Sequence, residues 1–372
     1  MTDLGTADMA MSADENGLLA PVSARQDLGS FGTPRGQEGR ARDDRRSTVG
    51  VIGAGKVGAA VANALALMRS CERIVLYNRG LARAEGQTWD ISDGTALVHE
   101  IEVLATDDWN DLAGVEVVVV TVGQSIDPGE SRLEIDGNDG LVRHVIARLD
   151  EVAPDAVVVI VSNPVDVLTR LAIECSSRPW QRIFGSGTVL DGARLRRSLG
   201  SALEVDPQSV HVHVLGEHGD SSVIAWSVAA IGPIPLETFP HPQSSRLDDV
   251  KQRCLRQMRR RGVHDILTRK GYTDAGIAAV VCRLVQAVLR NERRILTVST
   301  RALPDYEIGE HVVLGLPCVV GRNGIVQRLP LKLDAEEQRL LARSAAILDQ
   351  AYERLARFPR WPNGSLADGE RS

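Results

Sequence analysis

The alternation of hydrophobic and polar positions along this chain predicts strands that alternate with helices. Two runs are almost purely apolar, Val115–Val122 and Ala156–Val161, as is typical of strands buried on both faces of a sheet. Strands followed by helical periodicity indicate a parallel, doubly wound α/β sheet of the Rossmann type. The other elements expected in this part are strands at Thr48–Ile52 and Arg73–Tyr77 and helices ending near Met68 and covering Leu141–Val152.

The pattern changes beyond about Gly187, where helices surround short strands. This change predicts a second, mixed α+β domain, and 372 residues are enough for two domains. We therefore expect a dinucleotide-binding domain at 48–186 and a substrate domain at 187–357. Its helices are expected at 192–199, 245–261, 272–291 and 335–356, and its strands at 210–215, 312–320 and 324–330.

Both ends of the chain lack hydrophobic periodicity. Residues 1–47 are rich in Gly, Ser, Asp and Arg, and residues 358–372 are similarly polar, so both are predicted to be disordered tails. The first segment has no apolar core of a secretory signal, and its acidic residues argue against a transit peptide. A cytoplasmic protein is expected.

Composition and charge exclude several classes of function. The formal net charge of −6 argues against nucleic-acid binding, and no apolar stretch is long enough to predict a membrane span. The five cysteines form no CxxC pair and show no metal-ligand spacing, so no metal site is predicted. These observations favour a small molecule as the binding partner.

The first predicted strand runs into a glycine-rich turn that opens a helix. Gly53 permits the tight turn, Gly55 lets the backbone approach a pyrophosphate, and Gly58 lets helix and strand pack closely, with Lys56 and Val57 between them. The helix N-terminus offers unpaired N–H groups to phosphates. A glycine turn without a ligand is the alternative, but the surrounding strands favour a nicotinamide dinucleotide.

The end of the second predicted strand departs from the NAD pattern. An acidic residue is expected there to bind the ribose 2′-hydroxyl, but the chain has Asn78 and Arg79. An uncharged side chain followed by a guanidinium suits a 2′-phosphate, which favours NADP or weak discrimination between NAD and NADP. Alternatively, Arg79 is a solvated loop residue and NAD binds.

Three polar segments carry candidate catalytic residues. His218 lies between glycines in Gly216–Ser221, Asp191 and Arg194 are three positions apart in Phe184–Arg194, and Arg132 ends a polar turn. Positions three apart share a helix face. Each alone has an ordinary interpretation as a structural histidine, a helix cap or a surface charge.

Together these segments resemble the lactate/malate dehydrogenase family, and within it the bacterial L-lactate dehydrogenase-like enzymes. The resemblance covers roughly residues 48–357. The matching motifs occur in the family's order, namely GAGKVG, PGESR, VSNPVD, GSGTVLDGAR, GEHGDS, LTVST and GLPCVVGRNGI.

The resemblance implies a hydride-transferring oxidoreductase and a role for each matching residue. It implies that His218 exchanges a proton with the C2 oxygen of a 2-oxo acid and that Asp191 orients its imidazole. It implies that Arg194 binds the substrate carboxylate and that Arg132 closes over the substrate and polarises its carbonyl. Asn163 is then expected near both the C2 oxygen and the cofactor, with Gly123 as a further cofactor contact.

The resemblance also bears on the substrate. The position six before Arg132, which largely selects substrate in this family, is Ile126, and Asp127 follows it. Neither residue pairs with a second carboxylate, so a substrate with an apolar side chain is expected, and Thr273 is compatible with one. Malate dehydrogenase is the alternative, and a catalytically silent binding protein on the same scaffold is a remote one. A rearranged loop, in which Ile126 merely packs, is also possible.

Two further expectations follow from the resemblance. A homotetramer or homodimer is implied. Arg196 and His211 match positions that bind a sugar bisphosphate between subunits of some bacterial lactate dehydrogenases, although a solvated or interface pair of cations is the alternative.

Overall fold

A computed structural model describes residues 46–123, 137–240, 246–260 and 265–357. Ile126 and Arg132 lie outside the described residues, as do 1–45 and 358–372, which include most of both predicted tails. The residues from Arg46 onward form one compact unit, so the predicted division at 186/187 stays a prediction. Within the described residues, no helix combines the length and apolar character needed to cross a membrane.

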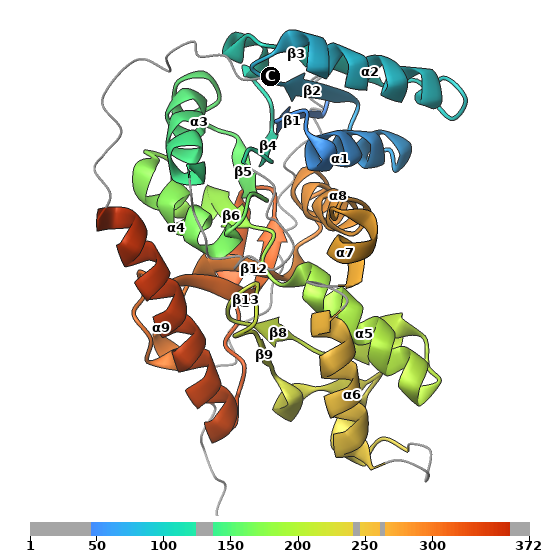
Figure 1. Cartoon of the computed structure of the whole chain (residues 1–372), viewed down its shortest axis with the longest axis vertical. Helices are drawn as coiled ribbons and strands as arrows, with labels where there is room; N and C mark the ends of the chain where they lie inside the picture. The colour runs from blue at the N-terminus through green and yellow to red at the C-terminus, as the bar shows by residue number, and fades with distance from the viewer. Residues whose placement is uncertain (1–45, 124–136, 241–245, 261–264, 358–372) are drawn as a thin grey trace, which may run out of the picture. The chain divides into compact units, whose positions relative to one another are not determined.

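A nine-stranded sheet forms the centre of this unit (Figure 1). Six of its strands are parallel and follow the order β3-β2-β1-β4-β5-β6, which is the Rossmann order. The predicted doubly wound fold is therefore confirmed. The six strands are β1 (Thr48–Ile52), β2 (Arg73–Tyr77), β3 (Glu102–Thr106), β4 (Val117–Val120), β5 (Val157–Ile160) and β6 (Ile183–Gly185).

Helices cover both faces of the parallel strands, as Figure 1 shows. Successive valines of β4 alternate between two hydrophobic cores, Val118 and Val120 in one and Val117 and Val119 in the other, which explains the nearly pure valine run. One core includes α3 (Asn138–Val152), α4 (Val165–Cys175) and α9 (Ala335–Arg357). The other includes α1 (Lys56–Leu67), α2 (Leu81–Thr95) and α8 (Ala275–Leu289).

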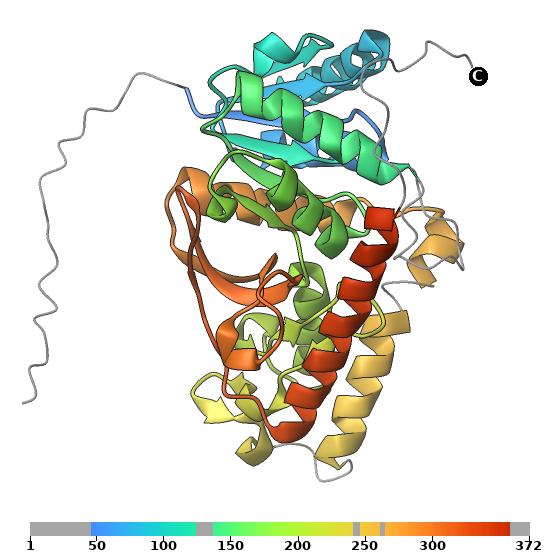
Figure 2. The same ribbon diagram turned by 90° about the vertical axis from the view of Figure 1, so that its left-hand side faces the viewer.

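The sheet continues antiparallel beyond β6. Ser299 of β12 (Arg294–Arg301) pairs with Gly185, and β13 (Val313–Gly321) and β14 (Gly324–Arg328) follow. The helix α9 runs alongside these strands and packs against α4 (Figure 2). One sheet therefore carries both the parallel strands and the antiparallel strands of the second part.

A third core holds the rest of the second part together. It lies between α5 (Val189–Leu203) and α6 (Leu247–Arg260) and includes residues of several short strands. The smaller elements are β7 (Val210–His211), β8 (Val214–Leu215), β9 (Val223–Ile224), β10 (Ala230–Ile231), β11 (Ile234–Pro235) and α7 (Ile266–Lys270).

Several predicted elements differ in their bounds from those observed, for example the helix predicted at 192–199, which spans Val189–Leu203, and two of the differences have a clear physical reason. The strand expected over 210–215 is divided, because β7 pairs with β10 whereas β8 pairs with β9. The helix expected from Tyr272 begins at Ala275, because the Asp274 side chain accepts the Ala275 N–H and caps the helix there.

A buried ion pair joins the ends of α3 and α4. Arg178 Nη2 lies 2.9 Å from Asp150 Oδ1, and the Arg178 side chain is 1% exposed. The Asp150 carboxylate also accepts hydrogen bonds from the Ser176 hydroxyl and the Ser177 N–H. Burial lowers the pKa of Arg178, and the Asp150 carboxylate opposes that shift.

Candidate active site

The histidine loop, Gly216–Ser221, follows β8 and is fixed by main-chain hydrogen bonds. Gly216 and Gly315 of β13 exchange N–H···O bonds of 3.0 and 2.8 Å. Gly216 has φ +81°, and a Cβ there would lie 2.6 Å from Ser344 Oγ of α9. A larger residue at Gly216 would therefore displace the loop from α9.

Glu217 stabilises the same loop, although sequence reasoning missed it. Its N–H donates to Ser344 Oγ at 2.9 Å, and its carboxylate accepts the Ser221 N–H at 3.1 Å and the Ser221 hydroxyl. Glu217 is buried, so these bonds offset the cost of removing its carboxylate from water. Glu217 and Ser221, which lie on either side of His218 along the chain, are thus hydrogen-bonded to each other, and Glu217 is also bonded to α9.

The loop brings His218 to Asp191 in the first turn of α5. Asp191 Oδ2 lies 2.6 Å from His218 Nδ1, and the two side chains are 12% and 15% exposed. Just before α5, Gly187 has φ +53°, and a Cβ there would lie 2.6 Å from the Ser299 nitrogen. Glycine is required at this position for the chain to enter α5 so close to β12.

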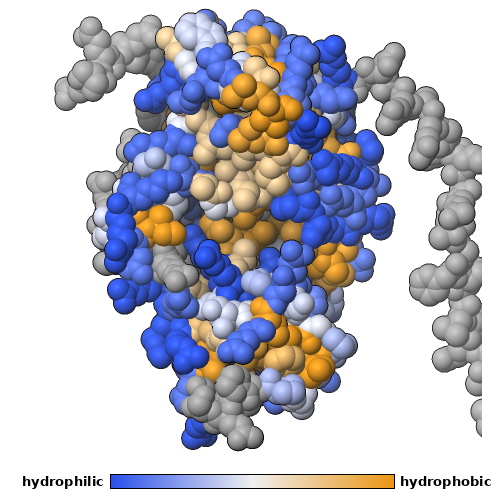
Figure 3. All heavy atoms as spheres, turned by 90° about the vertical axis from the view of Figure 1, so that its right-hand side faces the viewer, coloured by the Kyte–Doolittle hydropathy of each residue, from blue (hydrophilic) through white to orange (hydrophobic). Residues whose placement is uncertain are grey.

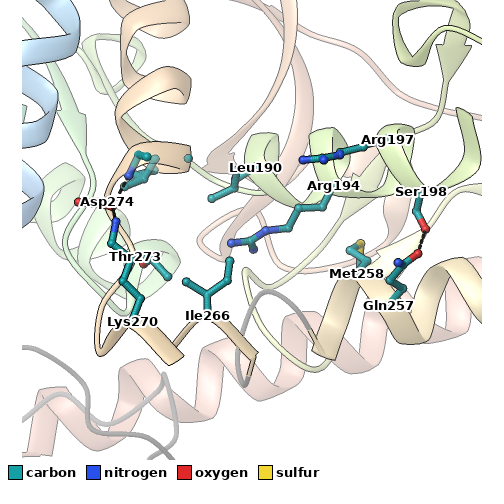
Figure 4. Close-up of a pocket in the computed structure, with 13 residues that line it drawn as sticks. Leu190, Arg194, Arg197, Ser198, Gln257, Met258, Ile266, Lys270, Thr273 and Asp274 are labelled. Atoms are coloured by element: carbon teal, nitrogen blue, oxygen red, sulfur yellow. Dashed lines mark hydrogen bonds and ion pairs between the residues drawn. The ribbon is translucent and has the colours of Figure 1, made fainter. Parts of the chain in front are cut away.

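Arg194 shares the Asp191 carboxylate with His218. Its Nη1 lies 3.1 Å from Asp191 Oδ1, as the spacing of three residues predicts. Arg194 extends from α5 into a pocket of about 260 Å³ (Figure 4). The pocket is also lined by Thr273 and by the apolar side chains of Leu190, Met258, Ile266 and Ile277. Its other polar lining side chains are Arg197, Ser198, Gln257, Lys270 and Asp274.

A second buried carboxylate, missed by sequence reasoning, supports the histidine loop from behind. Asp166, in the first turn of α4, is 2% exposed. It accepts the His218 N–H at 2.8 Å and the Ser299 hydroxyl at 2.6 Å. Its position directly after Asn163-Pro-Val, at the end of a buried strand, is the signal that could have identified it.

Comparison with known proteins identifies relatives of this chain. Residues 47–185 match the family model "lactate/malate dehydrogenase, NAD binding domain", and residues 188–358 match "lactate/malate dehydrogenase, alpha/beta C-terminal domain". The chain belongs to the lactate/malate dehydrogenase family. It is accordingly a hydride-transferring oxidoreductase that depends on a nicotinamide dinucleotide.

Individual members of this family match over most of their length. The L-lactate dehydrogenase of Thermoanaerobacter sp. (strain X514) is 37% identical over 309 residues, covering 82% of this chain and 98% of the relative. The structure of a lactate dehydrogenase from a Medee basin deep-sea metagenome library is 30% identical, with a TM-score of 0.78 and coverage of 84% and 99%. The Cryptosporidium parvum malate dehydrogenase is 25% identical, with a TM-score of 0.80 and coverage of 84% and 100%.

The glycine turn has the geometry that the family's NAD-binding domain requires. Gly53 has φ +105°, and a Cβ on Gly58 would lie 1.8 Å from the Gly53 oxygen. A Cβ on Gly55 would have no atom of the described residues within 4 Å, which leaves the backbone there open to a ligand. Within the same part of the chain, no side chain caps the N-terminus of α1, whose N–H groups suit phosphate oxygens. The turn therefore fits a dinucleotide pyrophosphate.

Other predicted cofactor residues surround this turn. Asn78 Oδ1 accepts the Ala54 N–H at 3.2 Å, and its Nδ2 donates to the Gly80 oxygen at 2.9 Å. Arg79 is exposed, and Val57 is half-buried. Lys56 Nζ lies 4.4 Å from the ring centre of Tyr272. Tyr272 directly precedes Thr273, which lines the pocket that contains Arg194, so this contact connects the glycine turn to that pocket.

Gly123 and Asn163 follow the neighbouring strands β4 and β5. Gly123 has φ +138°, and a Cβ there would lie 2.9 Å from Asn138 Oδ1. The side-chain amide of Asn138 donates a hydrogen bond of 2.9 Å to the main-chain oxygen of Asn163. Asn138 of α3, missed by sequence reasoning, therefore connects the two predicted cofactor contacts.

Arg196 and His211 lie in a group of basic side chains outside this site. Burial lowers the pKa of Arg196, and the positive charge of Arg294 adds to that effect. Burial likewise lowers the pKa of His213, assisted by the charges of Arg196 and His211. Mutual repulsion in this group would be relieved by an anion.

Proposed function

We propose that this chain interconverts a small L-2-hydroxy acid and its 2-oxo acid, with His218 as the proton-handling residue. The observation that carries the proposal is the Asp191 carboxylate, which contacts His218 Nδ1 at 2.6 Å and Arg194 Nη1 at 3.1 Å. A general acid–base and a carboxylate-binding cation are thus held in one rigid group. A bound nicotinamide cofactor supplies or accepts the hydride at C2 of the acid.

The chain's own residues perform the remaining steps. Because Nδ1 of His218 is hydrogen-bonded to the Asp191 carboxylate, proton exchange with the C2 oxygen of the substrate uses Nε2. The Asp191 carboxylate stabilises the imidazolium form and fixes the tautomer of the neutral ring. Arg194 binds the substrate carboxylate through its planar guanidinium. Asn163 forms a hydrogen bond near the C2 oxygen, and Arg132 polarises the carbonyl.

The proposed substrate has an apolar side chain. Leu190, Met258, Ile266 and Ile277 support this proposal because they line the pocket that contains Arg194. The test is a panel of 2-oxo acids: pyruvate, 2-oxobutyrate, 4-methyl-2-oxopentanoate and oxaloacetate. We expect one of the first three to give the highest kcat/KM. Oxaloacetate as the best substrate would indicate malate dehydrogenase activity, which the structural similarity to a malate dehydrogenase keeps as the second candidate.

The cofactor preference is proposed to be for NADP over NAD. Support comes from Asn78, which brings no negative charge to the end of β2, and from the exposed guanidinium of Arg79. Comparing kcat/KM with NADH and NADPH tests this, and a tenfold preference for NADH would contradict it. Asn78→Asp is expected to shift the preference toward NADH, since a carboxylate repels a 2′-phosphate.

A homodimer or homotetramer in the cytoplasm completes the proposal. Figure 3 supports an oligomer, because hydrophobic residues gather along the middle of the face that carries α1 and α8. Light scattering coupled to size-exclusion chromatography tests the assembly, and a monomer would contradict it. The five free cysteines, four of them buried, support a reducing compartment.

A further inference from the structure

Asp166 occupies a junction of three elements that meet behind the proposed proton-handling residue. It lies on α4, its Oδ2 accepts the main-chain N–H of His218 from the histidine loop, and its Oδ1 accepts the hydroxyl of Ser299 from β12. Asp166 and Ser299 are both almost completely buried. The junction fixes where the His218 backbone lies relative to the sheet.

A charged residue is costly at such a junction. A buried carboxylate loses its hydration, and burial raises the pKa of Asp166 to about 6 despite its two hydrogen bonds. A neutral acceptor such as an asparagine oxygen would serve the His218 N–H without that cost. The charge therefore calls for an explanation beyond hydrogen bonding.

The imidazole of His218 provides one. Its positive charge lowers the pKa of Asp166, so the Asp166 carboxylate and the charged imidazole attract each other through the low-dielectric interior. Other charged groups face the same region: Asp191 and Arg194 from α5, and Glu217 from the loop, which raises the pKa of Asp166. Asp191 forms a direct hydrogen bond with the imidazole ring, whereas Asp166 accepts the main-chain N–H of His218 and acts on the ring only through its charge.

We propose that Asp166 is a positioning residue for proton transfer, which fixes the His218 backbone and supplies a second negative charge that stabilises the imidazolium. This inference rests on the proposed function of His218. It adds a buried carboxylate, on the helix that follows Asn163, to the group that controls the protonation of the histidine.

Asp166→Asn isolates the charge from the hydrogen bonds. The asparagine oxygen still accepts the His218 N–H, and its NH₂ group donates to the Ser299 hydroxyl oxygen, so the geometry is kept. Ser344→Ala is the matched control, because it removes a neutral partner of the adjacent Glu217 N–H. The control loosens the same loop without changing its charge.

The first measurement is independent of turnover. In protein with ¹³C-labelled histidine, the His218 resonance is identified by its absence in His218→Gln and titrated with pH. We expect the midpoint in Asp166→Asn to lie about one pH unit lower than in the wild type, with Ser344→Ala unchanged. Equal midpoints in all three proteins, or an equal shift in Ser344→Ala, would overturn the proposal.

The second measurement is the pH profile of 2-oxo acid reduction, which needs the protonated imidazole. We expect the alkaline loss of kcat/KM to move to lower pH in Asp166→Asn, with an about tenfold loss of rate at slightly alkaline pH. NADH binding, followed by fluorescence, shows that the variant is folded. An inactive wild type would contradict the proposed function, whereas a normal profile in Asp166→Asn would contradict the role of Asp166.

Ser299→Ala keeps the proposal testable if Asp166→Asn does not fold. The Ser299 hydroxyl favours the charged form of Asp166, so its removal lets the carboxylate take up a proton at higher pH. Asp166 then carries less negative charge near neutral pH, so we expect the His218 resonance of Ser299→Ala to titrate with a lower midpoint than in the wild type, as in Asp166→Asn. An unchanged midpoint would count against a functional charge on Asp166.

Discussion

Asp191 Oδ2 and His218 Nδ1 lie 2.6 Å apart, although Asp191 belongs to the first turn of α5 and His218 to the loop after β8. The pair is formed by the fold, because the intervening chain must complete α5 and return through β7 and β8. A carboxylate at this distance both orients the ring and stabilises its positive charge.

Asp191→Asn is therefore expected to lower kcat by about two to four orders of magnitude, because an amide supports neither the required tautomer nor the imidazolium. Steady-state rates of 2-oxo acid reduction measure the loss. NADH binding should be unchanged and serves as the control for folding. A loss smaller than tenfold would contradict the role proposed for Asp191.

Arg194→Lys is expected to raise the KM for the 2-oxo acid by about 10- to 100-fold, since an ammonium cannot replace the planar fork of hydrogen bonds to a carboxylate. The matched control is Arg256→Lys on the exposed face of α6, which should leave KM unchanged. Equal KM values for the Arg194→Lys variant and the wild type would argue that the substrate carboxylate binds elsewhere.

Two alanine substitutions in the glycine turn should separate ligand binding from stability. The new Cβ of Gly55→Ala meets no atom within 4 Å in the part of the chain that the structure describes, and position 55 has φ −76°. We therefore expect an unchanged melting temperature but at least about tenfold weaker NADH binding. Gly58→Ala places a Cβ 1.8 Å from the Gly53 oxygen and should destabilise the protein by about 1–3 kcal/mol. Calorimetry and NADH titration measure the two effects. The same behaviour in both variants would contradict this division.

Asp150→Asn should destabilise the protein strongly, because it leaves the buried Arg178 cation without its counter-charge. The expected loss is about 3–5 kcal/mol in the free energy of unfolding, measured by urea denaturation. Glu151→Gln is the control: it breaks the exposed pair with Arg148 and should cost less than about 1 kcal/mol. Similar unfolding midpoints for the two variants would show that the buried ion pair between Asp150 and Arg178 stabilises the protein no more than the exposed pair does.

Arg196 and His211 match a sugar-bisphosphate site of some bacterial lactate dehydrogenases, and this resemblance predicts activation by such an effector. Fructose 1,6-bisphosphate should lower the half-saturating 2-oxo acid concentration, and Arg196→Ala should abolish that response, because the phosphate would relieve the repulsion among Arg196, His213 and Arg294. A wild type unaffected by millimolar effector would favour the alternative, a solvated or interface pair of cations.

The fold could be predicted where local pattern and tertiary structure agree. The strands Thr48–Ile52 and Arg73–Tyr77 were predicted to the residue, because buried parallel strands require apolar runs. The helix Leu81–Thr95 was missed, since its sequence is largely polar and contains Gly86 and Gly94, which weaken the helical signal. The strand Ile183–Gly185 is too short for any periodicity, and only its neighbours in the sheet define it.

The candidate site shows the same division. The contact between Asp191 and Arg194 follows from helical spacing and could be predicted. The contact between Asp166 and the His218 N–H could not, because 52 positions separate the two residues and a main-chain donor leaves no trace in the sequence. Ser344 is likewise one of several serines in the C-terminal part, and only the packing of α9 against the histidine loop distinguishes it.

The contribution of Ser344 has a consequence for the order in which the protein matures during synthesis. The Rossmann strands and the glycine turn are complete long before α9 has been translated, whereas the loop that carries His218 receives its Ser344 hydrogen bond only afterwards. A nascent or prematurely terminated chain that lacks α9 would therefore retain the nucleotide-binding turn but hold its histidine loop incompletely. Competence to bind the cofactor should precede competence to turn over substrate.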